Sequence, residues 1–397
     1  MRNRLLVGAM GALLALLSGC KGEDDGGGGG GGGGSAPPPP PAPQIGTGDH
    51  TASSVTLTPI TATGLATVNP SDLAFSPVAP YELWILCQNS AGTLDEYLII
   101  FDDAAAASIT GERIDSTKDG NWGHFYLNPS ALDFGAQTSS AGNGWTFATA
   151  QDGTRAGDHF MGPTLWSADR TVIGHYLPGF DLGLGSHLDM LHSSRYAKGI
   201  SHEASNIYWV LGEAYYTVMG GGGPKNCLTR YDFKVDHTPG KDDHSDGVRW
   251  NYAEGAISTL PGVPAHIFYE PASKWLYACD PGNHRIVKLD TQSGGTPTAV
   301  TAHGGDGQSF KVTGATLADF VAPGLLTTPC GLEIFNNTVF VSDYATGIIH
   351  AFDMAGNRIN WLDTGLGANA ITGMHFGPDG KLYFCDQAND RIVRIDP

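Results

Sequence analysis

The chain has 397 residues and a formal net charge of −18 at pH 7, with 22 Lys and Arg against 40 Asp and Glu. Binding to a phosphate backbone requires neutralising Lys and Arg side chains, so this composition argues against a nucleic-acid partner. The acidic residues are spread along the chain, which indicates solubility and is compatible with cation binding.

Residues 1–19 have the layout of a bacterial export signal. Arg2 and Arg4 precede an apolar run over 5–17, and small residues follow it. The run is too short to span a bilayer comfortably. The sequence LLSGC at 16–20 resembles the lipobox of bacterial lipoproteins, which implies cleavage before Cys20 and a lipid on its sulfur. An ordinary signal peptide with a chance cysteine is the alternative.

A tether is predicted over 20–50. It contains an unbroken glycine run at 26–34, followed by SAPPPPPAP. Glycine gives a flexible coil and proline a stiff spacer, so neither supports a core. We therefore expect a globular domain over 51–397, held by lipid to the cell envelope. Lys21, after the lipobox cysteine, favours the outer membrane in a Gram-negative host.

The domain contains repeats. The segments 274–290 (KWLYACDPGNHRIVKLD) and 380–396 (GKLYFCDQANDRIVRID) match almost position by position, and 337–353 is a third copy. Repeated strand units of about 40–50 residues indicate a β-propeller. The repeats resemble the NHL family, which implies an all-β ring of six four-stranded blades. We place the blades at about 70–117, 124–175, 186–260, 263–325, 327–365 and 370–397.

The last predicted blade is one strand short. The segment SSVTLTPI at 53–60 can supply that strand and close the ring. Closure removes the exposed sheet edges that would otherwise favour aggregation.

The predicted first strands of the blades begin PSDLAF, PSALDF, GSHLDM, PAHIFY, PCGLEI and ITGMHF. Their third positions should face the axis: Asp72, Ala131, His187, His266, Gly331 and Gly373. Two imidazoles and a carboxylate on one ring predict an axial metal ion, zinc or another transition metal, with an open coordination position. A hydrogen-bonded polar plug is the alternative.

A second metal site is predicted in the stretch VDHTPGKDDHSDG at 235–247. The candidate ligands are Asp236, His237, Asp242, Asp243, His244 and Asp246. The stretch predicts calcium-like or mixed-metal binding, although it lacks the spacing of an EF-hand. A solvated acidic loop is one alternative, and a loop whose His237 or His244 reaches the axis is another.

Further candidates for a functional face of the ring are His159, Asp189, His192, His202 and Glu203. They lie in or near the predicted second and third blades, which carry the longest insertions. Long insertions in a compact fold usually build a functional face.

The segment 264–286 is similar to blades of peptidyl-α-hydroxyglycine α-amidating lyases, and 154–162 (TRAGDHFMG) resembles their Arg-Gly-Asp-His segment. That resemblance implies an axial zinc ion, a substrate-binding Arg155, and Tyr215 or Tyr216 as a base. The predicted ring departs from it, with two histidines and an aspartate in place of three histidines. We expect either a metal-dependent lyase or hydrolase for a small or peptide substrate, or a non-catalytic propeller that binds a small molecule, peptide or protein.

The five cysteines after Cys20 are an odd number. Cys87, Cys279 and Cys385 occupy similar contexts and are expected in the core, whereas Cys227 and Cys330 could pair. We expect a monomer.

Overall fold

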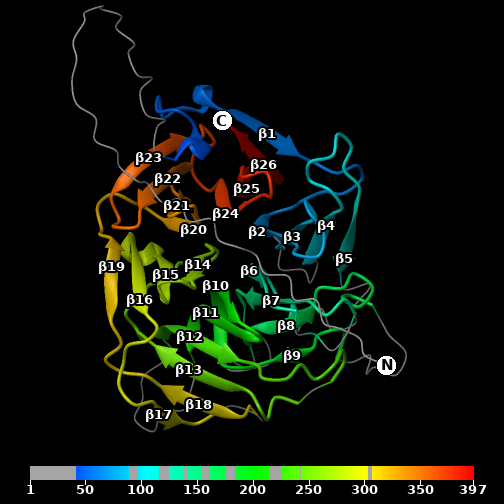
Figure 1. The fold of residues 1–397 in the computed structure, drawn as a ribbon, viewed down its shortest axis with the longest axis vertical. Helices are drawn as coiled ribbons and strands as arrows, with labels where there is room; N and C mark the ends of the chain where they lie inside the picture. Colours follow the sequence, from blue (N-terminus) through cyan, green and yellow to red (C-terminus); the bar gives the residue numbers. More distant parts are fainter. Residues whose placement is uncertain are drawn as a thin grey trace, which may run out of the picture. The chain divides into compact units, whose positions relative to one another are not determined.

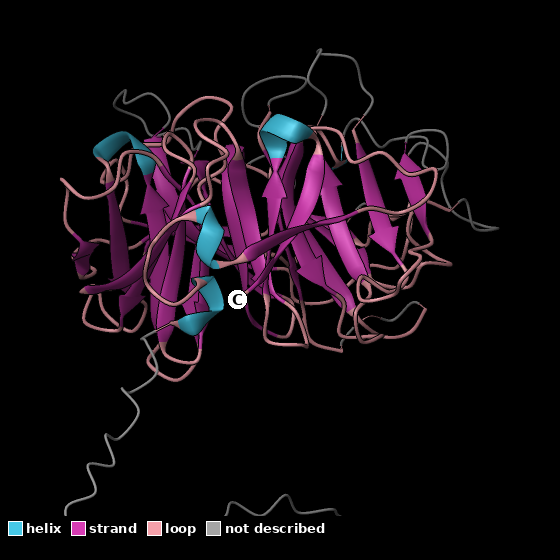
Figure 2. Ribbon diagram, turned by 90° about the horizontal axis from the view of Figure 1, so that it is seen from above, coloured by secondary structure: helices cyan, strands magenta, loops and turns pink. Residues whose placement is uncertain are grey.

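The computed structural model describes residues 42–397 apart from 89–95, 116–124, 138, 140–141, 154–160, 176–183, 215–224, 242 and 303–305. These residues belong to one compact unit, Pro39–Pro397. It is all-β, with six sheets arranged as a ring (Figure 1) and strands that run across the thickness of the ring (Figure 2).

The described part of the chain contains four short 3-10 turns: η1 (Pro43–Ile45), η2 (Ala52–Ser54), η3 (Pro281–Asn283) and η4 (Gln387–Asn389). None of these turns has the length and apolar character needed to cross a bilayer.

Each sheet is one blade, numbered in chain order. Blade 1 consists of β2 (Pro70–Phe75), β3 (Leu83–Cys87), β4 (Tyr97–Phe101) and β5 (Gly111–Asp115). Blade 2 consists of β6 (Pro129–Phe134), β7 (Thr146–Gln151), β8 (Thr164–Ser167) and β9 (Asp189–Met190). Blade 3 consists of β10 (Ser194–Ala204), β11 (Ile207–Ala214), β12 (Lys225–Asp232) and β13 (Val248–Tyr252), extended by β18 (Gln308–Lys311) and β17 (Thr298–Val300).

The C-terminal half supplies three regular blades. Blade 4 consists of β14 (Ile267–Glu270), β15 (Trp275–Asp280), β16 (Arg285–Asp290) and β19 (Leu317–Val321). Blade 5 consists of β20 (Pro329–Phe335), β21 (Thr338–Asp343), β22 (Ile348–Asp353) and β23 (Arg358–Asp363). Blade 6 consists of β24 (Ile371–Phe376), β25 (Leu382–Asp386), β26 (Arg391–Asp396) and β1 (Thr56–Ile60). The first strands β2, β6, β10, β14, β20 and β24 contact one another in a closed cycle around the axis.

The N-terminal strand closes the ring as predicted. β1 pairs with β26 in antiparallel register, from Thr56 opposite Asp396 to Ile60 opposite Ile392. The two strands lie side by side at the junction of the chain ends (Figure 1). The last blade therefore combines the two ends of the described chain.

The repeated motif has a clear structural role. In blade 4 the Asp280 carboxylate accepts hydrogen bonds from Asn283 Nδ2 at 2.9 and 3.0 Å and from Arg285 Nε at 2.7 Å. Asp386, Asn389 and Arg391 repeat this arrangement in blade 6. Each aspartate is fully buried, so the amide and guanidinium groups compensate its charge and fix the turn between the second and third strands.

Two predicted blade boundaries are wrong. The segment 186–190 completes blade 2, because β9 pairs with β8 through Thr164–Met190 and Leu165–Asp189. The first strand of blade 3 is β10, which forms a hairpin with β11. The strands β17 and β18, expected in the fourth blade, join blade 3 through the parallel pairing of β18 with β13.

All five cysteines of the described region are buried and free. Burial confirms the core placement of Cys87, Cys279 and Cys385. Cys227 lies on β12 of blade 3 and Cys330 on β20 of blade 5, and the two do not form a disulfide.

Candidate functional site

Six backbone positions form the ring at the axis: Asp72, Ala131, Gly199, His266, Gly331 and Gly373. The residues just before this ring join neighbouring blades. Ser71 Oγ donates to Pro129 O at 2.7 Å, Ser130 Oγ to Ala197 O at 2.6 Å, and Thr372 Oγ1 to Pro70 O at 2.9 Å. The same side-chain to backbone hydrogen bond recurs between neighbouring blades and so identifies the equivalent residues of those blades.

The predicted axial triad is wrong in one member, because Gly199 takes the position expected for His187. His187 lies before β9 in blade 2, where its ring stacks on Phe125 at 3.7 Å and its Nδ1 is 2.6 Å from Leu184 O. The segment 186–191 has the apolar character of a first strand, but its pairing with β8 makes it the outer edge of its blade.

Glycine at three of the six ring positions lets the first strands approach one another. A Cβ at Gly373 would lie 2.6 Å from Asp72 Cα and 3.0 Å from His266 Cε1. The side chains of Asp72 and His266 therefore occupy the space that the missing side chain leaves.

Asp72 and His266 come from opposite blades and meet on the axis. His266 Nε2 lies 3.1 Å from the Ser130 carbonyl oxygen, which can only accept, so Nε2 carries the proton. His266 Nδ1 faces Asp72 Oδ1 at 3.6 Å. The two Asp72 oxygens also accept from the backbone N–H groups of Leu73 and Leu132, each at 2.9 Å. A proton or a cation between Nδ1 and Oδ1 would relieve the opposition of their lone pairs.

Two residues further along the first strands, a second ring adds Asp133, Glu333 and His375. With Asp72 and His266 they line a cavity of about 60 Å³ on the axis. Asp72 and His266 are buried, whereas the residues of the second ring are partly exposed, so the cavity opens on the side of the second ring. This volume suits a few water molecules or a hydrated ion.

The electrostatics of the axial cavity favour neutral forms of its acids. Burial raises the pKa of Asp72 to about 6, and the nearby His266 opposes this shift. Burial together with the Asp133 and Asp72 carboxyls raises the pKa of Glu333 well above its ordinary value. Burial also lowers the pKa of His375, whose Nδ1 is 2.9 Å from the Phe376 carbonyl oxygen.

The sequence reasoning missed Asp133, Glu333 and His375, although the aligned strand openings contained the signal. Alternate residues of a strand share a face, so the fifth position points to the same side as the third.

A larger pocket lies between blades 2 and 3. It has a volume of about 360 Å³ and is lined by Asn128, Asp152, Tyr196, Lys198, Glu213, Asn226, Thr259, Pro261 and Gly262. The Lys198 ammonium donates to Asp152 Oδ2, and both side chains are almost completely buried. Glu213 accepts from Arg195 Nε at 2.8 Å. The formal charges of this pocket are therefore compensated within the protein.

Three predicted residues, Arg155, Tyr215 and His159, lie outside the described residues, as does the lipidation candidate Cys20. Two other candidates, His202 and Glu203, lie on the first strand of blade 3 and do not line the axial cavity. His202 Nε2 bonds the Ser205 carbonyl at 2.9 Å, and its backbone N–H donates to Asp133 at 2.7 Å. Glu203 accepts from Trp209 Nε1 and from Arg230, which makes it an ion-pair anchor on the sheet.

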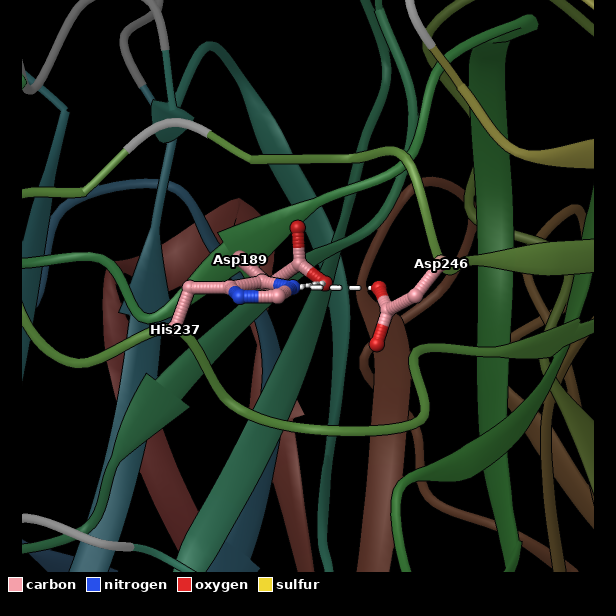
Figure 3. Close-up of side chains that lie close together, drawn as sticks. All are labelled: Asp189, His237 and Asp246. Carbon is pink, nitrogen blue, oxygen red and sulfur yellow. Dashed lines mark hydrogen bonds and ion pairs between the residues drawn. The ribbon is translucent and has the colours of Figure 1, made fainter.

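The acidic stretch packs against blade 2 and does not line the axial cavity. His237 Nε2 lies 3.1 Å from Asp246 Oδ1 and 4.0 Å from Asp189 Oδ2 (Figure 3). His244 Nδ1 lies 3.0 Å from Asp189 Oδ1, and His192 Nδ1 lies 2.8 Å from Asp306 Oδ1. Asp236 is buried, Asp243 is exposed, and Asp242 lies outside the described residues. The sequence singled out His237, His244 and Asp246 of the stretch and, separately, Asp189 and His192, but it did not predict that they meet.

Comparison with known proteins gives similarity of fold. No protein-family model matches the sequence, and no curated protein matches it. A Bacteroides thetaiotaomicron protein of unknown function has a TM-score of 0.52 at 9% identity, over 86% of this chain and 75% of that one. An auxiliary nutrient binding protein from Bacteroides ovatus has a TM-score of 0.48 at 14% identity, over 87% and 74%.

A luciferin-regenerating enzyme has a TM-score of 0.46 at 11% identity, over 86% of this chain and 95% of that one. The TM-score of 0.52 supports similarity of fold, and at 9% identity it assigns no activity. The predicted six-bladed propeller is confirmed, while the NHL and lyase resemblances stay predictions.

Proposed function

We propose that this propeller binds a small, uncharged, polar ligand in the pocket between blades 2 and 3. The observation that carries the proposal is the pocket of about 360 Å³, within the size range of small-molecule sites. The axial cavity, at about 60 Å³, is too small for an organic ligand of that size.

The chemistry of the pocket favours a ligand with several hydroxyl groups. Its charged side chains are neutralised by partners within the protein, through the pairs Lys198–Asp152 and Arg195–Glu213. A charged ligand would have to break one of these pairs or remain uncompensated, which is costly. The remaining lining groups are amides and hydroxyls, which both donate and accept, and the ring of Tyr196. A neutral saccharide has this complementarity.

The proposal is tested with a panel of neutral mono- and disaccharides, compared with uronic acids and amino sugars. Binding is measured by calorimetry on the purified protein and on the variants Asn226→Ala and Tyr196→Phe. We expect a neutral sugar to bind the parent and to bind both variants at least tenfold more weakly. Glu333→Gln, in the axial cavity, is the matched control and should bind as the parent. Equal binding to the parent and to both pocket variants would reject this pocket.

Metal-dependent lyase or hydrolase activity on the axis is the second candidate. It is favoured by the convergence of three carboxyls and two imidazoles from five blades on one cavity. His266 Nδ1 and Asp72 Oδ1 would bind the ion, with Asp133, Glu333 and His375 at the cavity mouth. A metal ion there would polarise a carbonyl group or activate water.

Elemental analysis separates the axial site from the acidic loop. We would compare the parent with His266→Ala/His375→Ala and with His237→Gln/Asp246→Asn. Metal that is lost only in the first double variant supports the axial site. Metal that is lost only in His237→Gln/Asp246→Asn would assign the ion to the acidic loop and would contradict an axial metal site.

We also propose that Cys20 carries a lipid that anchors the domain to the cell envelope. The support is the signal-like sequence 1–19, the lipobox-like 16–20 and the glycine and proline tether. Metabolic labelling with a fatty acid should mark the parent and not Cys20→Ser. Equal labelling of both would reject the anchor.

A further inference from the structure

A loop of blade 3 is docked on the outer strand of blade 2. The loop connects β12 to β13 and is held by its backbone: His237 N–H donates to Leu188 O at 3.2 Å, and Gly240 N–H donates to His187 O at 3.1 Å. These bonds place His237 and Asp246 opposite Asp189 of β9 (Figure 3). The loop position thus depends on backbone contacts, and the facing side chains are preorganised.

Three potential ligand atoms converge in this place. One atom each from Asp189, His237 and Asp246 lies within 4.8 Å of the other two, and within the described ranges no other three His, Cys, Asp or Glu residues meet this spacing. The two measured separations from His237 Nε2 are 3.1 Å to Asp246 Oδ1 and 4.0 Å to Asp189 Oδ2. Tetrahedral ligands with metal bonds of about 2.0–2.2 Å stand roughly 3.3–3.6 Å apart, which the two measured separations bracket.

The Asp189 carboxylate gives independent evidence that a ligand is missing. Asp189 is 1% exposed, and no described group donates a hydrogen bond to its Oδ2 atom. Its other oxygen, Oδ1, accepts from the Met190 backbone at 2.7 Å and lies 3.0 Å from His244 Nδ1. A buried carboxylate oxygen without a donor is costly, and this one points toward His237 Nε2.

We propose that Asp189, His237 and Asp246 bind one transition-metal ion of the zinc class, which fastens the blade 3 loop to blade 2. An imidazole with two carboxylates suits zinc-class ions, whereas calcium takes six to eight oxygen ligands and does not favour imidazole. The site is distinct from the proposed sugar pocket and from the axial cavity, because none of its three residues lines either.

Neighbouring residues support the ligands. His244 bonds the first Asp189 oxygen and so orients the carboxylate, as second-layer partners of metal ligands do. The His192 ring lies 4.9 Å from the His244 ring and is itself fixed by Asp306. Residues from both blades thus restrict the geometry of the site.

The test uses the purified protein without a histidine tag, freed of metal by a chelator that is then removed. Zinc is titrated against a chromogenic chelator, and cobalt(II) is added separately to detect tetrahedral ligand-field bands. We expect one zinc ion per chain and cobalt bands in the visible region. His237→Gln and Asp246→Asn should each weaken zinc binding at least tenfold and abolish the cobalt bands. Zinc should raise the thermal midpoint of the parent and not of these variants.

Asp243→Asn is the matched control within the loop, because Asp243 is exposed and bonds Ser245 at 2.7 Å. This variant should bind zinc as the parent does. Circular dichroism before metal addition verifies that His237→Gln and Asp246→Asn are folded. The Asp246 side chain is 36% exposed, so its replacement should be tolerated. Absence of zinc binding in the parent, unchanged binding in both ligand variants, or binding of calcium in place of zinc would overturn the proposal.

Discussion

His266 and Asp72 face each other across the axis of the ring, with 3.6 Å between Nδ1 and Oδ1, although they belong to blades 4 and 1. The pair is buried, and its surroundings are glycine and alanine at the other ring positions. We therefore expect the stability of the propeller to depend on pH and on the size of the side chains at its centre.

Asp72→Asn should change how stability depends on pH. Burial raises the pKa of Asp72 from 3.8 to about 6, so the folded state favours the protonated acid. The associated stabilisation is complete below about pH 4 and is lost as pH rises through 6. The shift of about two units corresponds to roughly 3 kcal/mol. Urea unfolding is measured at pH 4.5 and at pH 7. As pH rises between these values, the free energy of unfolding should fall by less, or gain more, in Asp72→Asn than in the parent. An identical loss in both proteins would contradict the prediction.

His350→Gln should remove a pH dependence of opposite sign. Burial lowers the pKa of His350, on β22, from 6.5 to about 4, so the folded state holds the imidazole neutral. Its contribution is present above pH 6.5 and is lost as pH falls through 4, with a size of roughly 3 kcal/mol. The parent should lose more stability than His350→Gln between pH 7 and 4.5, measured by urea unfolding. Parallel profiles would show that His350 does not titrate in this range.

Gly373→Ala should destabilise the centre of the ring. The new Cβ would lie 2.6 Å from Asp72 Cα, a backbone atom that cannot rotate away. Overpacking of this kind costs about 1–3 kcal/mol. The comparison is Gly295→Ala, whose Cβ would meet only Thr313 O at 3.4 Å. Thermal unfolding should separate the two variants, and equal midpoints would show that the first strands can move apart.

Lys198→Met should lower the free energy of unfolding by more than the loss of a surface ion pair would. The side chains of Lys198 and Asp152 are 2% and 6% exposed, so removing the cation leaves a buried carboxylate without compensation. Breaking a buried pair in this way costs about 3–5 kcal/mol. The double variant Lys198→Met/Asp152→Asn should lose less than the sum of the two single variants. Chemical denaturation measures all three, and additive losses would mean that the pair is not coupled.

Removal of residues 1–62 should expose a sheet edge. β1 supplies the fourth strand of blade 6, so its absence leaves one edge of β26 unpaired, while the other edge still pairs with β25. We expect aggregation or loss of cooperative unfolding, measured by light scattering and thermal melting. A protein that begins at Ala42 keeps β1 and the buried Ile45, and should melt as the parent does. A monomeric, cooperative protein without β1 would show that ring closure is dispensable.

The sequence alone determined the architecture, because the local signals repeat. The motif that contains Asp280, Asn283 and Arg285 recurs with Asp386, Asn389 and Arg391, and each copy fixes its own turn by contacts within a few residues. The closing strand was predictable because one blade lacked a strand and one apolar segment remained.

The site depended on tertiary structure. The sequence placed Asp72 and His266 on the axis correctly, but it put His187 beside them, because a short apolar segment can be an inner or an outer strand until its hydrogen-bond partner is known. The meeting of Asp189 with His237 and Asp246 likewise joins two blades through backbone bonds that no local pattern records. Local repeats specify the blades, whereas contacts between distant blades decide which side chains meet.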